Sequence, residues 1–366
     1  MPIHSPFASS FASPGNGQVV LDLLPPSIPT LTTLTYRYPL KLLSRTPAFT
    51  PDSSVLPAAT KPIHLYVLTY GGGLLPGDHI DVSITLCPRT RLVVTTPQGS
   101  TKIFKTAAGQ NRHDDDGGQR KEADGGDEEK SRQTLNVHIR SEAALCYLPD
   151  PSVPFKESRY EQVQTFTVDG NQTGDQRSSL CVLDWVTQGR ASRGETWDFH
   201  SWKGRNEVWS CDDNATRKRR LLLRDSVILD DESRHPHRQD PSSKVSCHPG
   251  NNGNKELIRE RTHPHGILGT LILYGPVFDP LGSFFIQTFA SQPRIGGRNW
   301  SSSTSSVAEP KSTDDVLWTA ARIRAGFVLV KFGAKDHETA REWLGGIIRG
   351  EGTITREFGE EALFCL

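Results

Sequence analysis

The chain of 366 residues is long enough for two ordinary domains, or for one large all-β domain enlarged by insertions. Its 42 lysines and arginines balance 42 aspartates and glutamates, so the global charge favours neither nucleic acid nor an anionic membrane as a partner. Hydrophobic residues make up 35% of the chain, beside 32 glycines and 25 prolines, which predicts a core diluted by loops.

Features of export and of membrane insertion are absent from the sequence. No apolar run approaches the roughly 20 residues that a membrane helix needs, and the first residues have neither a basic region nor a continuous apolar one. The six cysteines form no C-x-x-C pair. We therefore expect a cytoplasmic protein with free thiols.

Short β-strands are predicted along most of the chain. Residues 79–86 (HIDVSITL) alternate strictly between apolar and polar side chains, and 135–139 (LNVHI) repeat this pattern. The runs 179–186 and 326–332 are almost continuously apolar, which is typical of strands covered on both faces. Further strands are expected at 19–24, 34–43, 63–70, 91–96, 159–168, 268–273 and 284–289. About a dozen strands at this spacing predict a sandwich, a barrel or a β-helical stack.

One helix is predicted near the C-terminus. Ala340, Trp343, Leu344 and Ile347 follow helical spacing after Asp336, a suitable N-cap, and Gly350 can close the helix.

Three polar segments are predicted to be insertions in a single domain of residues 17–366. Residues 107–133 hold eight acidic and five basic side chains with alanine as the only apolar type, so they cannot offset the entropy of ordering. We interpret them as a disordered loop between two strands. Residues 231–262 and 297–315 have a similar composition and are interpreted as flexible insertions.

A glycine-rich stretch, TYGGGLLPGD (69–78), raises the question of a phosphate-binding loop. It contains Gly71, Gly72, Gly73 and Gly77, but the position where a P-loop has lysine is Asp78. Nucleotide binding is therefore disfavoured. A tight turn between two strands, in which glycine supplies positive φ or room for close approach, explains the sequence better.

Acidic side chains follow this turn and recur later in the chain. Asp78, Asp81, Asp150 and Glu195 lie in or near strand ends, and Asp184 lies inside an apolar run. Asp184 would be costly to bury without a partner, and Arg190 and Arg193 are close in sequence. Two interpretations stay open: a structural ion pair, or a carboxylate-lined path for a hard or borderline cation.

Two His-Pro-His triplets, 235–237 and 263–265, could suggest zinc. Proline prevents the helical i, i+4 geometry that clamps zinc in many sites, so loop residues are the better interpretation.

Several motifs occur together in a characteristic order. They are YPLKLL (38–43), YGGGLLPGD (70–78), TTPQGSTKIFK (95–105), YLPDPSVPF (147–155), SRYEQ (158–162) and DWVTQGRASRGETWDF (184–199). The set resembles the urease accessory protein D family (UreD, or UreH in some lineages), with polar insertions of a eukaryotic type. The resemblance marks as motif residues, besides the four glycines, Thr95, Thr96, Lys102, Pro149, Pro151, Asp184, Gly189, Arg190, Arg193 and Gly194.

The resemblance implies a fold and a role. The fold would be mostly β, a β-helical stack of short strands with one or two α-helices near the C-terminus. The role would be that of a non-enzymatic scaffold for nickel insertion, bound to an F-type accessory protein, a G-type GTPase and the urease apoprotein. Asp78, Asp81, Asp150 and Glu195 would then line a transient nickel path. No cofactor would be bound tightly, because nickel would be in transit.

Two other classes of function compete with the scaffold. A β-helical stack with two acids beside a groove could be a carboxylate-dependent carbohydrate-active enzyme, but the expected aromatic platforms and short regular coils are missing. A nucleic-acid module is disfavoured by the neutral charge balance and by the lack of an aromatic-basic motif.

Overall fold

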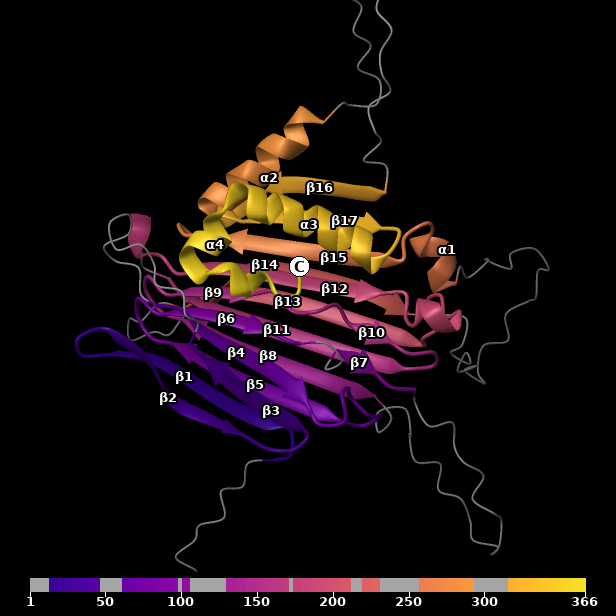
Figure 1. Ribbon diagram of the computed structural model, residues 1–366, viewed down its shortest axis with the longest axis horizontal. Helices are drawn as coiled ribbons and strands as arrows, with labels where there is room; N and C mark the ends of the chain where they lie inside the picture. The colour runs from indigo at the N-terminus through magenta and orange to yellow at the C-terminus, as the bar shows by residue number, and fades with distance from the viewer. Residues whose placement is uncertain are drawn as a thin grey trace, which may run out of the picture.

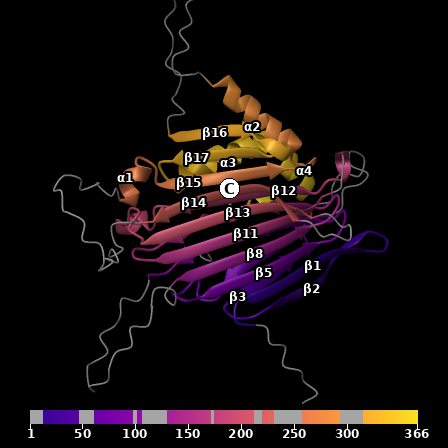
Figure 2. The same ribbon diagram turned by 180° about the vertical axis from the view of Figure 1, so that it is seen from behind.

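The computed structural model describes residues 13–46, 61–97, 101–105, 130–170, 174–211, 219–230, 257–292 and 315–366. Two β-sheets pack face to face, and helices cover part of the outer face of one sheet (Figure 1). Figure 2 shows the other sheet from its open side.

The open sheet has seven strands. In spatial order they are β14 (Arg219–Asp230), β13 (Ser201–Cys211), β11 (Arg159–Asp169), β8 (Ser131–Ile139), β5 (His79–Leu86), β1 (Asn16–Leu24) and β2 (Ile28–Tyr36). The alternation predicted for β5 is present: Ile80, Val82, Ile84 and Leu86 are buried between the sheets. This pattern places one face of the sheet in the core and leaves polar residues on the other face.

The second sheet has eight strands. Their order is β16 (Val316–Arg322), β17 (Val328–Ala334), β15 (Ile267–Tyr274), β12 (Ser179–Thr187), β9 (Ala144–Tyr147), β6 (Arg91–Thr95), β4 (Ile63–Thr69) and β3 (Leu40–Arg45). Two short strands, β7 (Lys102–Ile103) and β10 (Val153–Pro154), pair in parallel beside it. Every residue of β12 is buried, as its apolar sequence predicts, because the other sheet covers one face and the helical layer the other.

The middle of the chain crosses repeatedly between the sheets. From β4 to β13 it alternates, with β4, β6, β9 and β12 in one sheet and β5, β8, β11 and β13 in the other. Successive strands of each sheet pair in parallel. The chain therefore coils around one interior, and the prediction of a mostly-β fold is confirmed.

The described residues also contain four α-helices and four 3₁₀ turns: α1 (Ile258–Thr262), α2 (Asp279–Ser291), α3 (His337–Glu351), α4 (Thr353–Phe358), η1 (Gly174–Gln176), η2 (Ala191–Arg193), η4 (Arg324–Gly326) and η5 (Glu360–Leu363).

The helix predicted near the C-terminus is α3. Asp336 caps it by accepting a hydrogen bond from Thr339 N at 2.9 Å. It ends at Gly352 in the left-handed conformation, two residues beyond the expected Gly350. No helix among the described residues is both long and apolar enough to cross a membrane.

Two predicted strands are wrong in detail. Residues 284–289 lie in α2, where Leu281 and Phe285 are buried one turn apart, because a short apolar run fits either element. Residues 34–43 are divided between β2 and β3 by a turn at Tyr38 and Pro39.

The predicted insertions overlap described structure at their ends. Strand β8 begins at Ser131, inside the segment 107–133, and α1 occupies 258–262 of the segment 231–262. Asp315, at the end of the segment 297–315, directly precedes β16. Residues 107–129, 231–256 and 297–314 lie outside the described residues, and so do the first His-Pro-His triplet and Cys247. The five described cysteines are free thiols.

Candidate functional site

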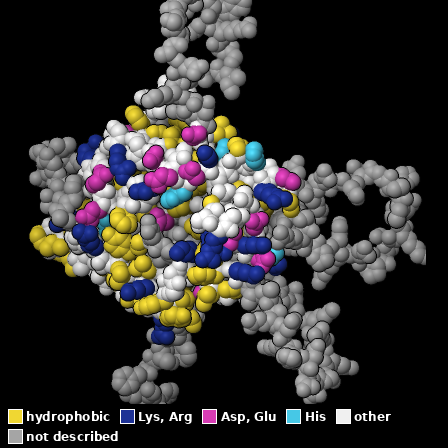
Figure 3. Space-filling model, turned by 45° about the vertical axis from the view of Figure 1, so that its right-hand side comes forward, with side chains coloured by type: hydrophobic (Ala, Val, Ile, Leu, Met, Phe, Trp, Pro, Cys, Tyr) yellow, Lys and Arg dark blue, Asp and Glu magenta, His cyan; other side chains and the backbone are white. Residues whose placement is uncertain are grey.

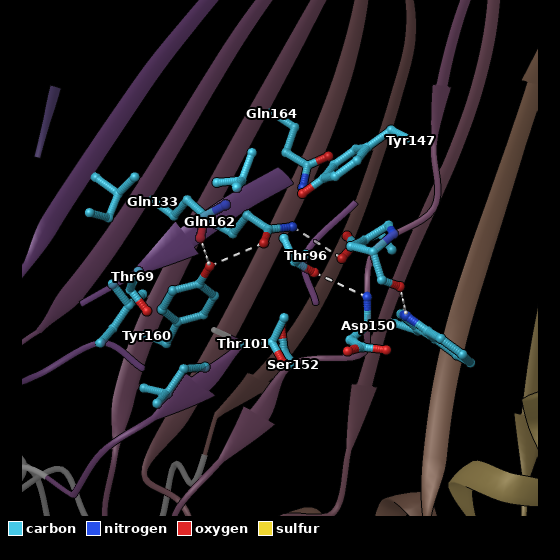
Figure 4. Close-up of a pocket in the computed structure, with 17 residues that line it drawn as sticks. Thr69, Thr96, Thr101, Gln133, Tyr147, Asp150, Ser152, Tyr160, Gln162 and Gln164 are labelled. Carbon is cyan, nitrogen blue, oxygen red and sulfur yellow. Dashed lines mark hydrogen bonds between the residues drawn. The ribbon is translucent and has the colours of Figure 1, made fainter. Parts of the chain in front are cut away.

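A small polar cavity lies between the two sheets (Figure 4). It encloses about 30 Å³, enough for about two water molecules. Side chains with oxygen and nitrogen atoms enter it from both sheets: Gln133, Tyr147, Tyr160, Gln162, Gln164 and Asp184. Such a group of polar side chains inside an apolar sandwich is costly unless its members bind one another or a ligand.

Strand β11 supplies three of the polar side chains in the cavity wall, Tyr160, Gln162 and Gln164. Its inward side chains follow a period of two, so Tyr160, Gln162 and Gln164 face the interior together with Phe166 and Val168. Gln133 on β8 lies opposite Gln162 in the parallel register.

Hydrogen bonds connect these side chains across the gap. The Tyr160 hydroxyl lies 3.2 Å from Gln133 Oε1 and 3.1 Å from Gln162 Oε1. Gln162 Nε2 donates to Asp184 Oδ1 at 3.1 Å, and Asn206 Nδ2 donates to Asp184 Oδ2 at 2.7 Å. Gln164 Oε1 and Asn206 Oδ1 are buried and accept no hydrogen bond from the protein. These two oxygens can therefore still accept hydrogen bonds inside the core.

Asp184 is held by amides and not by an arginine. Burial raises its pKa to about 6, although the hydrogen bonds from Asn206 and Gln162 act in the opposite direction. The expected partners Arg190 and Arg193 lie elsewhere, so that prediction is wrong. The Asp184 carboxyl lacks a directly bonded positive charge among its described partners.

The polar side chains continue from Asp184 toward the far edge of the sheets. Asn206 on β13 pairs in register with Asp225 on β14. Asp225 is 8% exposed and binds Lys331 Nζ of β17 at 2.6 Å. We call Gln162, Asp184, Asn206, Asp225 and Lys331 the polar row. Because the Lys331 side chain is 45% exposed, the row reaches from the buried cavity to the surface.

A surface cleft of about 550 Å³ meets the opposite side of the cavity. Its wall includes Lys102, Pro151, Gly189, Arg190 and His337. Thr101 and Asp150 line both the cleft and the cavity. Asp150 therefore lies where solvent-accessible space adjoins the buried polar side chains.

Asp150 is surrounded by Thr96, which follows β6, and by Cys365 near the C-terminus. Its backbone N–H donates to Thr96 Oγ1 at 3.1 Å. Burial raises the pKa of its carboxyl to about 6, while a hydrogen bond with the Cys365 thiol and the charge of Arg341 lower it. Burial also raises the pKa of Cys365, whose Sγ lies 3.8 Å from Thr96 O. Asp150 and Asp184 are thus two carboxyls whose ionised forms are disfavoured by burial.

Glu195 has a different environment from these two acids. Arg190 Nε lies 3.0 Å from both of its carboxylate oxygens, Arg190 Nη2 contacts Oε1, and the backbone N–H groups of Lys156 and Arg190 also donate to Oε2. Burial would raise the pKa of Glu195, but the bonds and charge of Arg190 outweigh it and lower the pKa. The Arg190 guanidinium also lies 3.8 Å from the centre of the Phe155 ring. Glu195 is therefore part of an ion pair that holds the loop after β12.

Asp78 and Asp81 lie away from the cavity. Asp78 Oδ2 accepts a hydrogen bond from Leu75 N at 2.8 Å and so closes the glycine-rich turn. Asp81 lines a depression with Asn16 and Thr35 on the outward face of the open sheet, and its Oδ1 is buried without a hydrogen-bond partner. The four predicted acids do not lie in one row: of the four, Asp150 alone lines the cavity. Within the described ranges, no three His, Cys, Asp or Glu side chains are close enough together to hold a metal ion.

The glycine-rich stretch forms a turn, as predicted. Gly71, Gly72 and Gly77 have φ of +84°, +75° and +83°, which side chains disfavour. A Cβ on Gly73 would lie 2.7 Å from Lys102 O, because Leu74 N donates to this carbonyl at 2.8 Å. The turn thus packs against β7 and contributes Leu74 to the cavity wall.

Motif residues that are far apart in sequence converge at the cleft and the cavity. Thr96, Lys102, Pro149, Pro151, Asp184, Gly189 and Arg190 all line one or the other, or bind their walls. Trp185 Nε1 donates to Pro149 O at 2.8 Å and fixes the segment before Asp150. Thr95 ends β6, and Arg193 and Gly194 end the η2 turn after the cleft residues.

The amides of the cavity were not predicted as functional. The sequence did contain a signal, since Gln162 and Gln164 have the same strand phase as Tyr160, Phe166 and Val168. Two glutamines on the face of a strand that points into the core indicate a polar interior. Gln133 was instead assigned to an insertion, and nothing local in sequence connects Asn206 with Asp184.

The convergence of these motifs agrees with comparison to known proteins. A family model described as UreD urease accessory protein matches residues 16–362. The chain belongs to this family. A ureD-like urease accessory protein of Schizosaccharomyces pombe is 28% identical over 314 residues, which cover 86% of this chain and 87% of the relative. Urease accessory protein 4 of Cryptococcus neoformans var. grubii is 28% identical over 337 residues, 88% of this chain and 86% of the relative. Urease accessory protein D of Arabidopsis thaliana is 33% identical over 204 residues, 56% of each chain.

Proposed function

We propose that this chain is a non-enzymatic scaffold that carries nickel into the urease apoprotein during urease maturation. Membership of the UreD family supports a role in maturation, as do the fungal and plant relatives, which are urease accessory proteins by name. In this role the chain binds an F-type accessory protein, a G-type GTPase that brings nickel, and urease itself. Nickel is cargo, and no cofactor is held tightly.

The cavity supports a specific path for the ion. Nickel enters at the cleft, meets Asp150, and continues to Asp184 and the neighbouring Asn206. The observation that carries this proposal is that Asp150 lines both the open cleft and the buried cavity. Carboxylate and amide oxygens are suitable as weak successive ligands for a hard or borderline cation.

The raised pKa values of Asp150 and Asp184, each about 6, fit transient cation binding. Burial disfavours an uncompensated charge on either carboxyl, so binding of an arriving cation that neutralises this charge is favoured. Glu195 offers no such role because Arg190 already neutralises it. Of the acids that the sequence predicted for the nickel path, we therefore keep Asp150, and Asp184 takes the place of Glu195.

The carbohydrate-active alternative has no support from the family or from the relatives. It also conflicts with size, because a space for about two waters cannot hold a sugar ring between Asp150 and Asp184.

The path is tested by the double variant Asp150→Asn with Asp184→Asn. Asparagine keeps the shape of both side chains and removes both charges. We expect urease nickel content and activation to fall about tenfold or more, while the assembly with the F-type protein, the G-type protein and urease still forms. Asp279→Asn is the matched control, because this aspartate lies on α2 and is far more exposed. Full nickel loading by the double variant would overturn the path.

The sequence-based path makes a different prediction for Asp78→Ala with Asp81→Ala. If these two acids are stops for nickel, this pair lowers nickel content as strongly as the cavity pair. Because neither residue lines the cavity, we expect the loss to be much smaller. A loss confined to the Asp78 and Asp81 variant would move the path to the open sheet.

A further inference from the structure

The α-helices that cover the eight-stranded sheet make few contacts with its last two strands, β4 and β3. Helix α3 packs on β16 and β17, and α4 packs on β6. The C-terminal segment reaches β4 through His64 Nε2, which lies 3.2 Å from Phe358 O of α4, and it reaches β3 through Arg45 and Glu361 of η5. Figure 1 shows the helices over the upper strands of this sheet, with β4 and β3 below them.

This part of the sheet exposes apolar and aromatic side chains beside two basic ones, Lys41 and Arg45. On the outer face, β3 presents Leu43, while β4 and the residue after it present Tyr66, Leu68 and Tyr70. Tyr38 lies against Tyr70, with ring centres 5.6 Å apart. We call these five residues the apolar strip. Tyr38, Tyr70 and Leu43 are 66%, 46% and 43% exposed.

The C-terminal segment borders the strip. Arg45 on β3 binds Glu361 of η5 at 3.3 Å, and Phe364 is 65% exposed. Figure 3 shows hydrophobic side chains gathered on the lower part of the molecule, at the height where Figure 1 places β3 and β4. Contiguous exposed aromatic and aliphatic side chains are typical of a surface that is covered by a partner.

We propose that the apolar strip binds an amphipathic helix of a partner protein, laid beside α4 as the next member of the helical layer. Two strands span about 10 Å, which matches the width of one helix. The seven residues of β4 extend about 23 Å, so a helix of about 15 residues would cover them. A helix in this place would continue the packing that α3 and α4 already make on the neighbouring strands.

The charges beside the strip determine the polar side of that helix. Lys41 lies over the Tyr70 ring at 5.6 Å from its centre, and Arg45 is on the same face of β3. Both are basic, and Glu361 is already bound to Arg45. The partner helix therefore carries leucine-type or aromatic side chains on one face and acidic residues along the edge that meets Lys41.

This inference rests on the proposed function for the identity of the partner, and the F-type accessory protein is the probe. The full-length chain and the variant Leu43→Asp are each titrated with that protein. We expect Leu43→Asp to weaken binding about tenfold or more. Ile228→Asp is the matched control, since Ile228 is an apolar strand residue 60% exposed on β14 of the other sheet, and it should bind as the unmodified chain does. Equal thermal unfolding midpoints confirm that both variants fold.

A charge variant tests the acidic edge separately. Lys41→Glu should weaken binding and flatten its dependence on salt, because it removes an attraction that salt screens. Hydrogen exchange of the complex should protect β3, β4 and one helical segment of the partner.

The outcomes distinguish the two proposals. If the unmodified chain does not bind the F-type protein, the proposed function fails. If it binds and Leu43→Asp binds equally well, the helix site alone is overturned. The site is also overturned if Leu43→Asp separates a homodimer without changing partner affinity, since a second copy would then occupy the strip.

Discussion

Gln162 Nε2 lies 3.1 Å from Asp184 Oδ1, and this hydrogen bond joins the two sheets inside the core. Gln162 comes from β11 of the open sheet and Asp184 from β12 of the covered sheet. The contact therefore places an amide and a carboxyl together in the core, where burial raises the pKa of Asp184 and the Gln162 hydrogen bond opposes this effect.

The first prediction concerns the pH dependence of stability. Burial raises the pKa of Asp184 from 3.8 to about 6, so the folded state binds this proton more tightly than the unfolded chain does. The associated stability is fully present below pH 4 and is lost as the pH rises through about 6. The loss is about 2 to 3 kcal/mol.

Asp184→Asn should remove this dependence. Urea unfolding at intervals between pH 4 and pH 7.5 measures it, and the unmodified chain should lose about 2 to 3 kcal/mol more than the variant over that range. Asp279→Asn serves as the exposed control. Parallel curves for the unmodified chain and Asp184→Asn would show that the carboxyl is not protonated preferentially in the folded state.

The second prediction concerns Arg190 and Glu195. Arg190→Leu leaves the Glu195 carboxylate, which is 7% exposed, with backbone donors alone. We expect the free energy of unfolding to fall by about 2 to 3 kcal/mol. Glu195→Gln keeps much of the hydrogen bonding and should cost about 1 kcal/mol.

The pH dependence of this pair has the opposite sign to that of Asp184. The pKa of Glu195 is lowered, so its contribution is present above about pH 4.5 and is lost as the pH falls. Nickel delivery by the folded Glu195→Gln variant should be unchanged. A strong loss of nickel transfer with normal stability would return Glu195 to the ion path.

The third prediction concerns the boundary of the first polar segment. Replacing residues 107–129 by a Gly-Ser linker should leave folding and urease activation intact, because this composition cannot contribute to a core. Extending the replacement to 107–133 should lower the free energy of unfolding by about 2 kcal/mol or more. Ser131 Oγ donates to Leu75 O at 2.8 Å, and Gln133 Oε1 accepts from Tyr160.

Soluble yield and denaturant unfolding distinguish the two replacements. Equal stability of both proteins would mean that β8 does not need its first residues. Loss of activation by the shorter replacement alone would instead show that residues 107–129 have a role in the assembly.

The sequence by itself determined the class of fold and the family. Strict alternation in residues 79–86 placed the apolar side of β5 in the core, and the almost continuously apolar run 179–186 predicted a strand covered on both faces. These predictions succeed because burial acts on each side chain locally, at a fixed period. The glycines at 71–73 were likewise recognisable, since positive φ and close approach exclude most other residues.

Tertiary structure alone decided which acids share a site. The segments that carry Asp150 and Asp184 come together because the chain crosses to the open sheet and returns once between them, and Asn206 reaches Asp184 through another crossing. Arg190, close to Asp184 in sequence, instead turns with the loop after β12 to bind Glu195. Partners of this kind depend on the register between strands distant in the chain, and no local period contains that information.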